Sequence, residues 1–312
     1  MSHFARALEL AERGRGNVED HPLVGAVVVA DGEVIGEGWY EYATVDHAEV
    51  RALAQAGERA RGATLYVTLE PCSHQGRTPP CTDAVIEAGI ARVVVGALDP
   101  NPVASGGVEK LRDAGIEVQL LESDEARRQN EAWRTWKALG RPFVTYKAAV
   151  TLDGRVSAAG RRWISGEESR RLVHELRAAS DAVAVGMGTV RADAPRLDAR
   201  DVVVMRQPRR LVFGRGPLPE DSELELRSGP LEEELRILAA EGVQSLLLEG
   251  GPTLATAFLE ADLVDKLLLF VAPVPGGEGP RFVGESVQLE LSHFAIRRVG
   301  EDVLMEAYVH QL

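Results

Sequence analysis

The sequence contains only two cysteines, Cys72 and Cys81, and both lie in one proline-rich loop. Two thiols cannot supply the dense disulfide framework of a small secreted domain. The N-terminus runs directly into an amphipathic pattern and lacks the apolar segment of a signal peptide. In such a chain, closely spaced cysteines indicate metal ligands rather than a structural disulfide. We therefore expect a cytoplasmic protein with reduced cysteines.

The sequence also lacks long apolar runs and an excess of positive charge. No run reaches the roughly 18 apolar residues of a membrane span. The formal net charge is −13, from 48 acidic and 35 basic residues, which argues against a surface that neutralises a nucleic-acid backbone. We expect neither a membrane nor a nucleic acid as partner. Local pairs such as Arg161-Arg162 still allow binding of a small phosphorylated metabolite.

The length of 312 residues exceeds the usual size of one hydrophobic core and favours two domains of about 150 residues. β-rich runs alternate with helical patterns through both halves, which indicates an α/β protein. Asp31-Gly32 lies between two β-rich runs and predicts a hairpin, so the first sheet should be mixed. A polar helix over residues 123–140 should end at Gly140, before Pro142. We therefore expect a first domain, a linking helix and a second domain, at residues 1–122, 123–140 and 141–312.

Two separated segments form the first chemical pattern: His-Ala-Glu at residues 47–49 and Pro-Cys-Ser-His-Gln-Gly-Arg-Thr-Pro-Pro-Cys at residues 71–81. Together they resemble the zinc nucleobase-deaminase signature, in which one His and two Cys hold zinc while a Glu moves protons. Such a ligand set leaves one tetrahedral position open for a water, whose pKa then falls towards neutrality. We predict His47, Cys72 and Cys81 as zinc ligands and Glu49 as the catalytic proton carrier.

Each of these residues has an ordinary alternative explanation when taken alone. A histidine at a helix start is often a surface residue, and cysteines are often small buried side chains. Two separated segments that match the signature in the correct order favour the zinc interpretation.

Eight residues separate the two cysteines, instead of the two that are common in this signature. The longer loop resembles the riboflavin-pathway deaminases, as do Thr68-Leu69-Glu70 and the Asp-Pro-Asn-Pro segment at 99–102. The family's substrate is a diaminopyrimidine with a ribosylamino 5-phosphate, and the resemblance implies that His74 and Arg77 contact it. The pattern departs at His21, where the family usually carries asparagine. An imidazole cannot offer a carbonyl acceptor and an amide donor together, so we expect altered efficiency or substrate choice at this contact.

The second chemical pattern begins with a β-rich run and an Asp-Gly turn at residues 142–157. The segments Trp-Ile-Ser-Gly at 163–166, His-Glu-Leu-Arg at 174–177 and Leu-Glu-Gly-Gly-Pro-Thr-Leu at 248–254 follow. From about residue 141 to the end, the chain thus resembles the reductase of the same pathway, which has the dihydrofolate reductase fold. The resemblance implies NADPH-dependent reduction of the ribosyl group to ribityl, with the cofactor carrying the chemistry.

Two glycine clusters, at 186–189 and 249–253, each follow a β-rich run and precede a helical pattern. Such turns bring backbone amides close to a phosphate. They are also common as plain turns, and neither cluster has the dinucleotide fingerprint.

The resemblance implies specific contacts in the reductase half. Trp163 in the core and Arg177 on a solvated helix face are the ordinary alternatives for these two residues. The implied substrate contacts are Lys147, Trp163, Arg177, Asp193, Arg200 and Glu249. The implied cofactor contacts are Thr151, Asp153, Ser165, Gly186, Gly188, Thr189, Gly250, Gly251, Pro252 and Thr253.

These patterns together predict a bifunctional enzyme, with a cytidine-deaminase-like α/β/α domain followed by a dihydrofolate-reductase-like α/β domain. Its cofactors would be Zn²⁺ and NADPH, and family analogy implies a homo-oligomer joined through the reductase half. Two alternatives stay open. One is a nucleoside or tRNA deaminase with an unrelated appendage. The other is a chain with only one active half, suggested by His21 and by a region, 214–240, that is shorter than the family norm.

Overall fold

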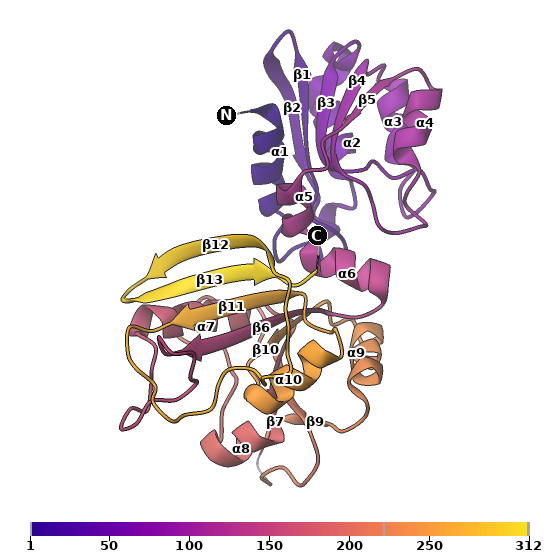
Figure 1. Cartoon of the computed structure of the whole chain (residues 1–312). Coiled ribbons are helices and arrows are strands. Elements are labelled where there is room, and N and C mark those ends of the chain that lie inside the picture. The colour runs from indigo at the N-terminus through magenta and orange to yellow at the C-terminus, as the bar shows by residue number, and fades with distance from the viewer. Residues whose placement is uncertain (1, 221, 311–312) are drawn as a thin grey trace. The chain divides into compact units, whose positions relative to one another are not determined.

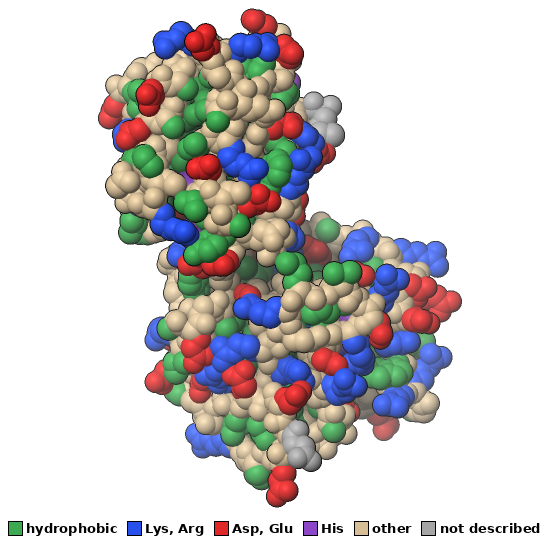
Figure 2. Space-filling view, turned by 180° about the vertical axis from the view of Figure 1, so that it is seen from behind, with side chains coloured by type: hydrophobic (Ala, Val, Ile, Leu, Met, Phe, Trp, Pro, Cys, Tyr) green, Lys and Arg blue, Asp and Glu red, His purple; other side chains and the backbone are tan. Residues whose placement is uncertain are grey.

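The structure is a computed structural model that describes residues 2–220 and 222–310 (Figure 1). It divides into two compact units, one ending at Leu139 and the other beginning at Gly140. Each unit has its own β-sheet. Within the described residues, no helix combines the length and apolarity needed to cross a bilayer. Acidic and basic side chains are interspersed over the face of each unit that Figure 2 shows.

The first unit contains a five-stranded mixed sheet in the order β2-β1-β3-β4-β5. β1 is antiparallel to β2 and β3, whereas β3, β4 and β5 are parallel. Asp31 and Gly32 have φ angles of 52° and 80°, as expected for a tight hairpin turn. The predicted hairpin and mixed sheet are therefore confirmed. The strands are β1 (Gly25–Ala30), β2 (Glu33–Trp39), β3 (Thr64–Leu69), β4 (Arg92–Ala97) and β5 (Glu117–Leu120).

Helices cover both faces of this sheet. Val27 and Val29 of β1 pack with α1, while the alternate residues Ala26 and Val28 pack in the cluster that includes α2. The helices are α1 (His3–Glu12), α2 (Ala48–Ala56), α3 (Cys81–Glu87), α4 (Gly107–Asp113), α5 (Asp124–Gln129) and α6 (Glu131–Leu139), with the short 3₁₀ helices η1 (Tyr42–Thr44) and η2 (Gly57–Ala60).

Two glycines of β2 fix the position of α2. A Cβ atom at Gly36 or Gly38 would lie 2.1 Å from the carbonyl oxygen of Ala52 or Ala48. Only glycine permits so close an approach of helix to strand. The N-terminal end of α2 is thereby held firmly against the sheet.

The sequence predicts one helix over residues 123–140, and this prediction is wrong in detail. The structure has two helices, α5 and α6, separated at Asn130. The buried Asn130 side chain accepts a hydrogen bond from the Leu23 N–H (2.8 Å) and donates one to the Leu23 carbonyl (2.9 Å). This long-range pairing holds the junction in a non-helical conformation.

The second unit contains an eight-stranded sheet in the order β12-β13-β11-β6-β10-β7-β8-β9. The strands β6 to β11 are parallel, and β13 and β12 add an antiparallel edge. The short region 214–240 retains a strand, β9, and a helix, α9. The strands are β6 (Phe143–Val150), β7 (Ala182–Gly186), β8 (Arg209–Phe213), β9 (Glu225–Arg227), β10 (Ser245–Leu248), β11 (Lys266–Val271), β12 (Ser292–Val299) and β13 (Asp302–Tyr308).

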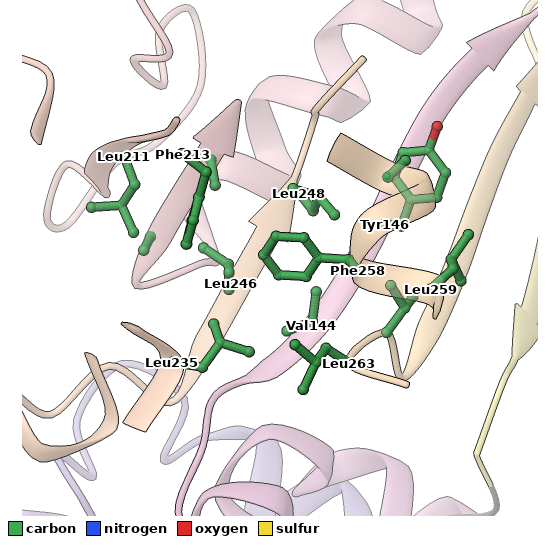
Figure 3. Close-up of a cluster of buried hydrophobic side chains, with 14 of the residues drawn as sticks. Val144, Tyr146, Leu211, Phe213, Leu235, Leu246, Leu248, Phe258, Leu259 and Leu263 are labelled. Carbon is green, nitrogen blue, oxygen red and sulfur yellow. The ribbon is translucent and has the colours of Figure 1, made fainter. Parts of the chain in front are cut away.

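Helices cover both faces of this sheet too. On one face, α9 and α10 contribute Leu235 and Phe258 to the main core (Figure 3). The rings of Phe213 and Phe258 meet edge to face, with centroids 5.3 Å apart. On the other face, Val173 of α7 and Val190 of α8 pack in smaller clusters. The helices are α7 (Glu167–Ala178), α8 (Met187–Asp193), α9 (Leu231–Ala240) and α10 (Pro252–Glu260).

Candidate active sites

The three predicted zinc ligands come from three elements of the first unit. His47 is the residue directly before α2, Cys81 is the first residue of α3, and Cys72 lies in the loop after β3. Their ligand atoms all lie within 4.8 Å of one another. His47 Nδ1 is 3.1 Å from Cys81 Sγ and 3.6 Å from Cys72 Sγ. The structure thus brings together the residues that the motif predicts.

The chemistry of this donor set fits zinc. Two buried sulfurs and one imidazole nitrogen are the ligands of a tetrahedral site with one open position. A hydrogen bond with Cys81 lowers the pKa of Cys72, whereas the same bond and burial raise the pKa of Cys81. A bound divalent cation stabilises both sulfurs as thiolates.

Glu49 lies in the first turn of α2 and is 3% exposed. Burial raises the pKa of Glu49 to about 7, although the nearby His47 opposes this shift. A carboxyl group with a pKa near neutrality can both accept and donate a proton at physiological pH. This property suits a proton carrier beside a metal site.

A cavity of about 210 Å³ opens onto these residues. His21, His74 and Arg77 line the same cavity, so the structure gathers the predicted deaminase contacts in one place. His21 Nδ1 lies 2.9 Å from an oxygen of Asp20. Its ring centroid is 5.2 Å from that of Tyr40. The exposed Arg77 guanidinium lies 4.8 Å from the centre of the Tyr42 ring.

In the second unit, three predicted substrate contacts form a charged cluster. Arg177 of α7 donates two hydrogen bonds to Glu249, at 2.5 and 3.0 Å. Lys147 of β6 places its Nζ 3.7 Å from the same carboxylate. Burial lowers the pKa of Lys147. Burial opposes ionisation of Glu249 as well, but Lys147 and Arg177 together hold its pKa below the ordinary value.

Both glycine clusters form strand-to-helix turns, as predicted. Gly186 ends β7 and precedes α8, and Gly251 precedes α10. β7 and β10 are parallel neighbours, so both turns lie at one edge of the sheet. A Cβ atom at Gly251 would lie 3.5 Å from Thr189 Oγ1. The carboxyl edge of a parallel sheet is a common place for ligands.

Comparisons with known proteins match both halves. Residues 1–97 match the cytidine and deoxycytidylate deaminase zinc-binding region, and residues 142–305 match the RibD C-terminal domain. The RibD riboflavin biosynthesis protein of Aquifex aeolicus is 41% identical over 97% of this chain and 97% of its own. The chain belongs to the RibD family.

Other RibD proteins are also similar to this chain over nearly its whole length. The Escherichia coli protein is 39% identical, covering 97% of both chains. The structure of Acinetobacter baumannii RibD is 36% identical, with a TM-score of 0.83 over 99% of this chain and 98% of that one. A Thermotoga maritima structure has a TM-score of 0.82, with 36% identity over 98% of this chain and 97% of that one.

Membership of the RibD family confirms the predicted fold class: a cytidine-deaminase-like domain followed by a reductase domain of the dihydrofolate reductase type. It also confirms a bifunctional deaminase and reductase of riboflavin biosynthesis, with zinc and NADPH as cofactors. Both halves match, so nothing here favours a chain with a single active half.

The RibD reductase half contains a buried residue that the sequence did not single out. Asp198 is 8% exposed and receives ion pairs from Arg200 (2.6 Å) and Arg196 (2.8 Å). Its carbonyl oxygen accepts a hydrogen bond from Arg177 and lies 3.2 Å from His174 Nδ1. Asp198 therefore links the predicted Arg200 to the Arg177 cluster.

Thr151 and Asp153 are engaged in bonds within the protein. Asp153 accepts hydrogen bonds from the Thr151 hydroxyl (2.7 Å) and from the backbone N–H groups of Gly276 (2.7 Å) and Gly277 (3.2 Å). The loop after β6 is thereby fastened to the loop after β11. A role of the two side chains as cofactor contacts stays a prediction.

The remaining predicted residues lie nearer to the surface. Trp163 is 58% exposed, so the core-packing alternative does not hold. The guanidinium of Arg170 lies 5.9 Å from its ring centre, and the same Arg170 donates a hydrogen bond to the Ser165 carbonyl. Asp193 ends α8 and is exposed.

The lining of the deaminase cavity also includes residues that were not predicted as site residues, among them Glu70, Asp99, Trp133 and Lys137. Glu70 accepts hydrogen bonds from the N–H groups of Asp99 (3.1 Å) and Val108 (2.9 Å). Burial raises the pKa of Asp99 to about 6. Glu70 and Asp99 belong to the Thr-Leu-Glu segment at 68–70 and the Asp-Pro-Asn-Pro segment at 99–102, which resemble the family. Trp133 and Lys137 of α6 also line the cavity, and no motif pointed to them.

Proposed function

We propose that the first half deaminates 2,5-diamino-6-ribosylamino-4(3H)-pyrimidinone 5′-phosphate and that the second half then reduces the ribosyl group to ribityl. The observation that carries this proposal is the convergence of His47, Cys72 and Cys81 beside the buried Glu49 in one cavity. The Thermotoga maritima relative is described as a diaminohydroxyphosphoribosylaminopyrimidine deaminase/5-amino-6-(5-phosphoribosylamino)uracil reductase, which supports the choice of substrate.

In the deaminase half, His47, Cys72 and Cys81 hold zinc, and Glu49 moves protons. When bound, zinc supplies an activated water for attack on the ring carbon that bears the amino group. Glu49 transfers one proton from the water to the ring nitrogen, and then transfers the proton of the added hydroxyl group to the amino group, which leaves as ammonia. The near-neutral pKa of Glu49 supports both transfers.

The cavity residues orient the substrate. Arg77 contacts the sugar phosphate through charge-assisted hydrogen bonds, while His74 and His21 contact the sugar or the base. The His21 imidazole packs beside the Tyr40 ring, with an oxygen of Asp20 2.9 Å from its Nδ1. This arrangement supports a contact by the ring in place of the usual asparagine.

In the reductase half, Lys147, Arg177 and Glu249 bind the substrate, with Trp163, Asp193 and Arg200 at its periphery. When bound, NADPH would supply the hydride for the reduction of C1 of the ring-opened ribosyl group. The turns with Gly186, Gly188 and Thr189 and with residues 250–253 offer backbone amides to its phosphates, and Ser165 adds a contact. The adjacency of the two turns supports this assignment.

Mass spectrometry of the zinc-loaded enzyme with the diaminopyrimidine phosphate tests the proposal. Without NADPH, we expect one amino group to be replaced by oxygen. With NADPH, we expect a further gain of two hydrogens. A substrate that stays unchanged would contradict the proposed deamination. A product that does not gain two hydrogens with NADPH would contradict the proposed reduction.

We also propose a cytoplasmic homo-oligomer joined through the reductase half. The edge strand β12 carries two exposed apolar side chains, Phe294 (57% exposed) and Ile296 (66% exposed). Burying such side chains against a second copy would remove apolar surface from water. The free thiols of Cys72 and Cys81 are in keeping with a reducing compartment. Light scattering of the wild type and of the Phe294→Glu variant tests the assembly, and a monomeric wild type would contradict it.

A further inference from the structure

Lys137 differs from the other lysines of this chain. The sequence contains four lysines. Three of them form ion pairs: Lys110 with Asp83 (2.6 Å), Lys147 with Glu249 (3.7 Å) and Lys266 with Glu306 (2.9 Å). Within residues 2–220 and 222–310, Lys137 has no carboxylate partner, and its Nζ lies 4.0 Å from the centre of the Trp136 ring. Lys137 therefore keeps an unneutralised positive charge.

This charge belongs to the deaminase cavity. Lys137 is half-buried and lines the cavity together with Glu49 and Arg77. Trp133, one helical turn earlier on α6, is 5% exposed and lines the same cavity. Residues four apart lie on one face of a helix. The cavity-facing side of α6 thus carries an indole and an ammonium group.

Helix α6 is fastened to two other parts of the cavity wall. At its N-terminal end, Asn130 bonds both backbone groups of Leu23, two residues after His21. Farther along, Arg134 donates a hydrogen bond to the Leu98 carbonyl (2.8 Å), directly before Asp99. These bonds hold the helix that carries Lys137 in a defined place.

The acidic residues of the cavity leave this charge available to a ligand. Each oxygen of Glu70 accepts a backbone N–H group, Asp99 accepts one from Asn101, and Asp20 lies beside His21. Among the described residues, no ion pair joins Lys137 to any of these carboxylates or to Glu49. Arg77, the other cationic side chain of the lining apart from histidines, also has no carboxylate partner among the described residues and contacts the Tyr42 ring. A half-buried cation without a counter-charge is costly unless a ligand supplies one. The half-buried Lys137 and the exposed Arg77 together suit a phosphate, which carries nearly two negative charges at neutral pH.

We propose that Lys137 binds the 5′-phosphate of the deaminase substrate as a second cation beside Arg77. The inference rests on the proposed function and deepens it. It assigns to α6, beyond the last strand of the first sheet, a direct part in substrate selection. A substrate without the phosphate would lose this contact, so the deaminase half should discriminate against the unphosphorylated nucleoside.

Deamination kinetics of Lys137→Met with two substrates test this role. The substrates are the diaminopyrimidine ribosylamino 5′-phosphate and the same compound with a free 5′-hydroxyl. For the phosphorylated substrate, we expect kcat/KM to fall about 10- to 100-fold, mainly through KM, because a hydrogen bond to a charged group contributes about 1.5–3 kcal/mol. For the 5′-hydroxyl compound, we expect wild-type kinetics. Lys137→Arg should restore most of the loss, and Lys110→Met, the matched control on α4, should behave as wild type.

A second measurement does not depend on turnover. In the Glu49→Gln variant, which should bind the substrate without converting it, reductive methylation of lysines can be mapped by mass spectrometry. The phosphorylated substrate should protect Lys137 and leave Lys110 reactive, while the 5′-hydroxyl compound should protect neither. This measurement decides the question even where Lys137→Met fails to fold.

The outcomes separate this inference from the proposed function. An equal loss of kcat/KM for both substrates, or an unprotected Lys137, would overturn the phosphate contact while leaving the deaminase assignment intact. A zinc-loaded wild type that converts neither compound would instead overturn the proposed function, and the phosphate contact with it.

Discussion

The two halves of the molecule each contain a deeply placed glutamate, and the two glutamates differ in charge state. Glu49 is 3% exposed, and burial raises its pKa to about 7. The Glu249 side chain is 9% exposed, yet its pKa lies below the ordinary value because Lys147 and Arg177 outweigh burial. The same residue type thus serves as a proton carrier in one half and as a permanent anion in the other.

The surroundings of the two carboxyl groups explain this difference. Arg177 binds both oxygens of Glu249, and Lys147 adds a second positive charge. The neighbours of Glu49 are instead His47 and the two cysteines, groups suited to a metal, and they do not outweigh the effect of burial on its pKa. The neighbouring groups therefore decide whether a buried carboxyl group exchanges a proton or stays ionised. A substitution in one site should inactivate that site and leave the other active.

The largest effect should come from Glu49→Gln. The amide cannot carry a proton, so we expect deamination to fall by at least about 10³-fold, while zinc stays stoichiometric and reduction is unchanged. Atomic absorption and separate assays of the two reactions check this result. Cys72→Ser should differ from it by losing the metal as well. Deamination that persists in the Glu49 variant would remove this residue from the mechanism.

Glu249→Gln should break the reductase half. Removing one partner of a buried ion pair costs about 3–5 kcal/mol because the other charge is left uncompensated. We expect reduction to fall at least about 100-fold, with deamination within about twofold of wild type. The matched control is Glu232→Gln on α9, which removes an exposed ion pair with Arg236 and should change neither activity. Equal loss of both activities would mean that the two sites do not act independently.

The deaminase site could be predicted from the sequence because its chemistry is concentrated in two short segments. His47 and Glu49 are two positions apart, and both cysteines lie in one loop. The hairpin at Asp31-Gly32 and the glycine turns were predictable for a similar reason, since their conformations depend on neighbouring residues.

The remaining features depend on contacts between distant residues. The break between α5 and α6 is set by Asn130 and Leu23, which are 107 positions apart. Asp198 lies between two arginines in the sequence and resembles a surface residue, yet it is buried beneath them. Lys137 lies on a polar helix, and only the folded chain places it in the cavity.

Asp153→Asn should have a smaller effect on reduction than Glu249→Gln. The comparison separates a residue that stabilises a loop, Asp153, from one that organises the charged cluster, Glu249. An amide keeps one acceptor oxygen for Gly276 but presents a donor to the Gly277 N–H, which weakens the fastening of the loop. We expect kcat/KM for reduction to fall about 3- to 10-fold, with deamination unchanged. The exposed Glu278→Gln, in the same loop, should have no effect, and a loss as large as that of Glu249→Gln would place Asp153 at the reacting groups.

The smallest effect concerns the stability of the reductase half as a function of pH. His310 lies 3.0 Å from an oxygen of Asp265 and 2.9 Å from one of Asp262, and the Asp265 carboxylate also receives two hydrogen bonds from Arg141. The hydrogen bond to Asp265 raises the pKa of His310 above its ordinary value, although burial opposes the shift. The folded state therefore binds the His310 proton more tightly than the unfolded state.

The sign of the effect follows from this raised pKa. The stabilisation is fully present below about pH 6.5, the unfolded pKa of histidine, and is lost as the pH rises through the folded pKa. Because His310 is partly exposed, we expect a contribution of about 0.5–1 kcal/mol. In calorimetry, the transition that NADPH shifts upwards reports the reductase half. The difference in its midpoint between wild type and His310→Gln should be largest near pH 6 and should shrink towards pH 9. A difference that stays constant over this range would mean that His310 stabilises the fold by packing and not by its charge.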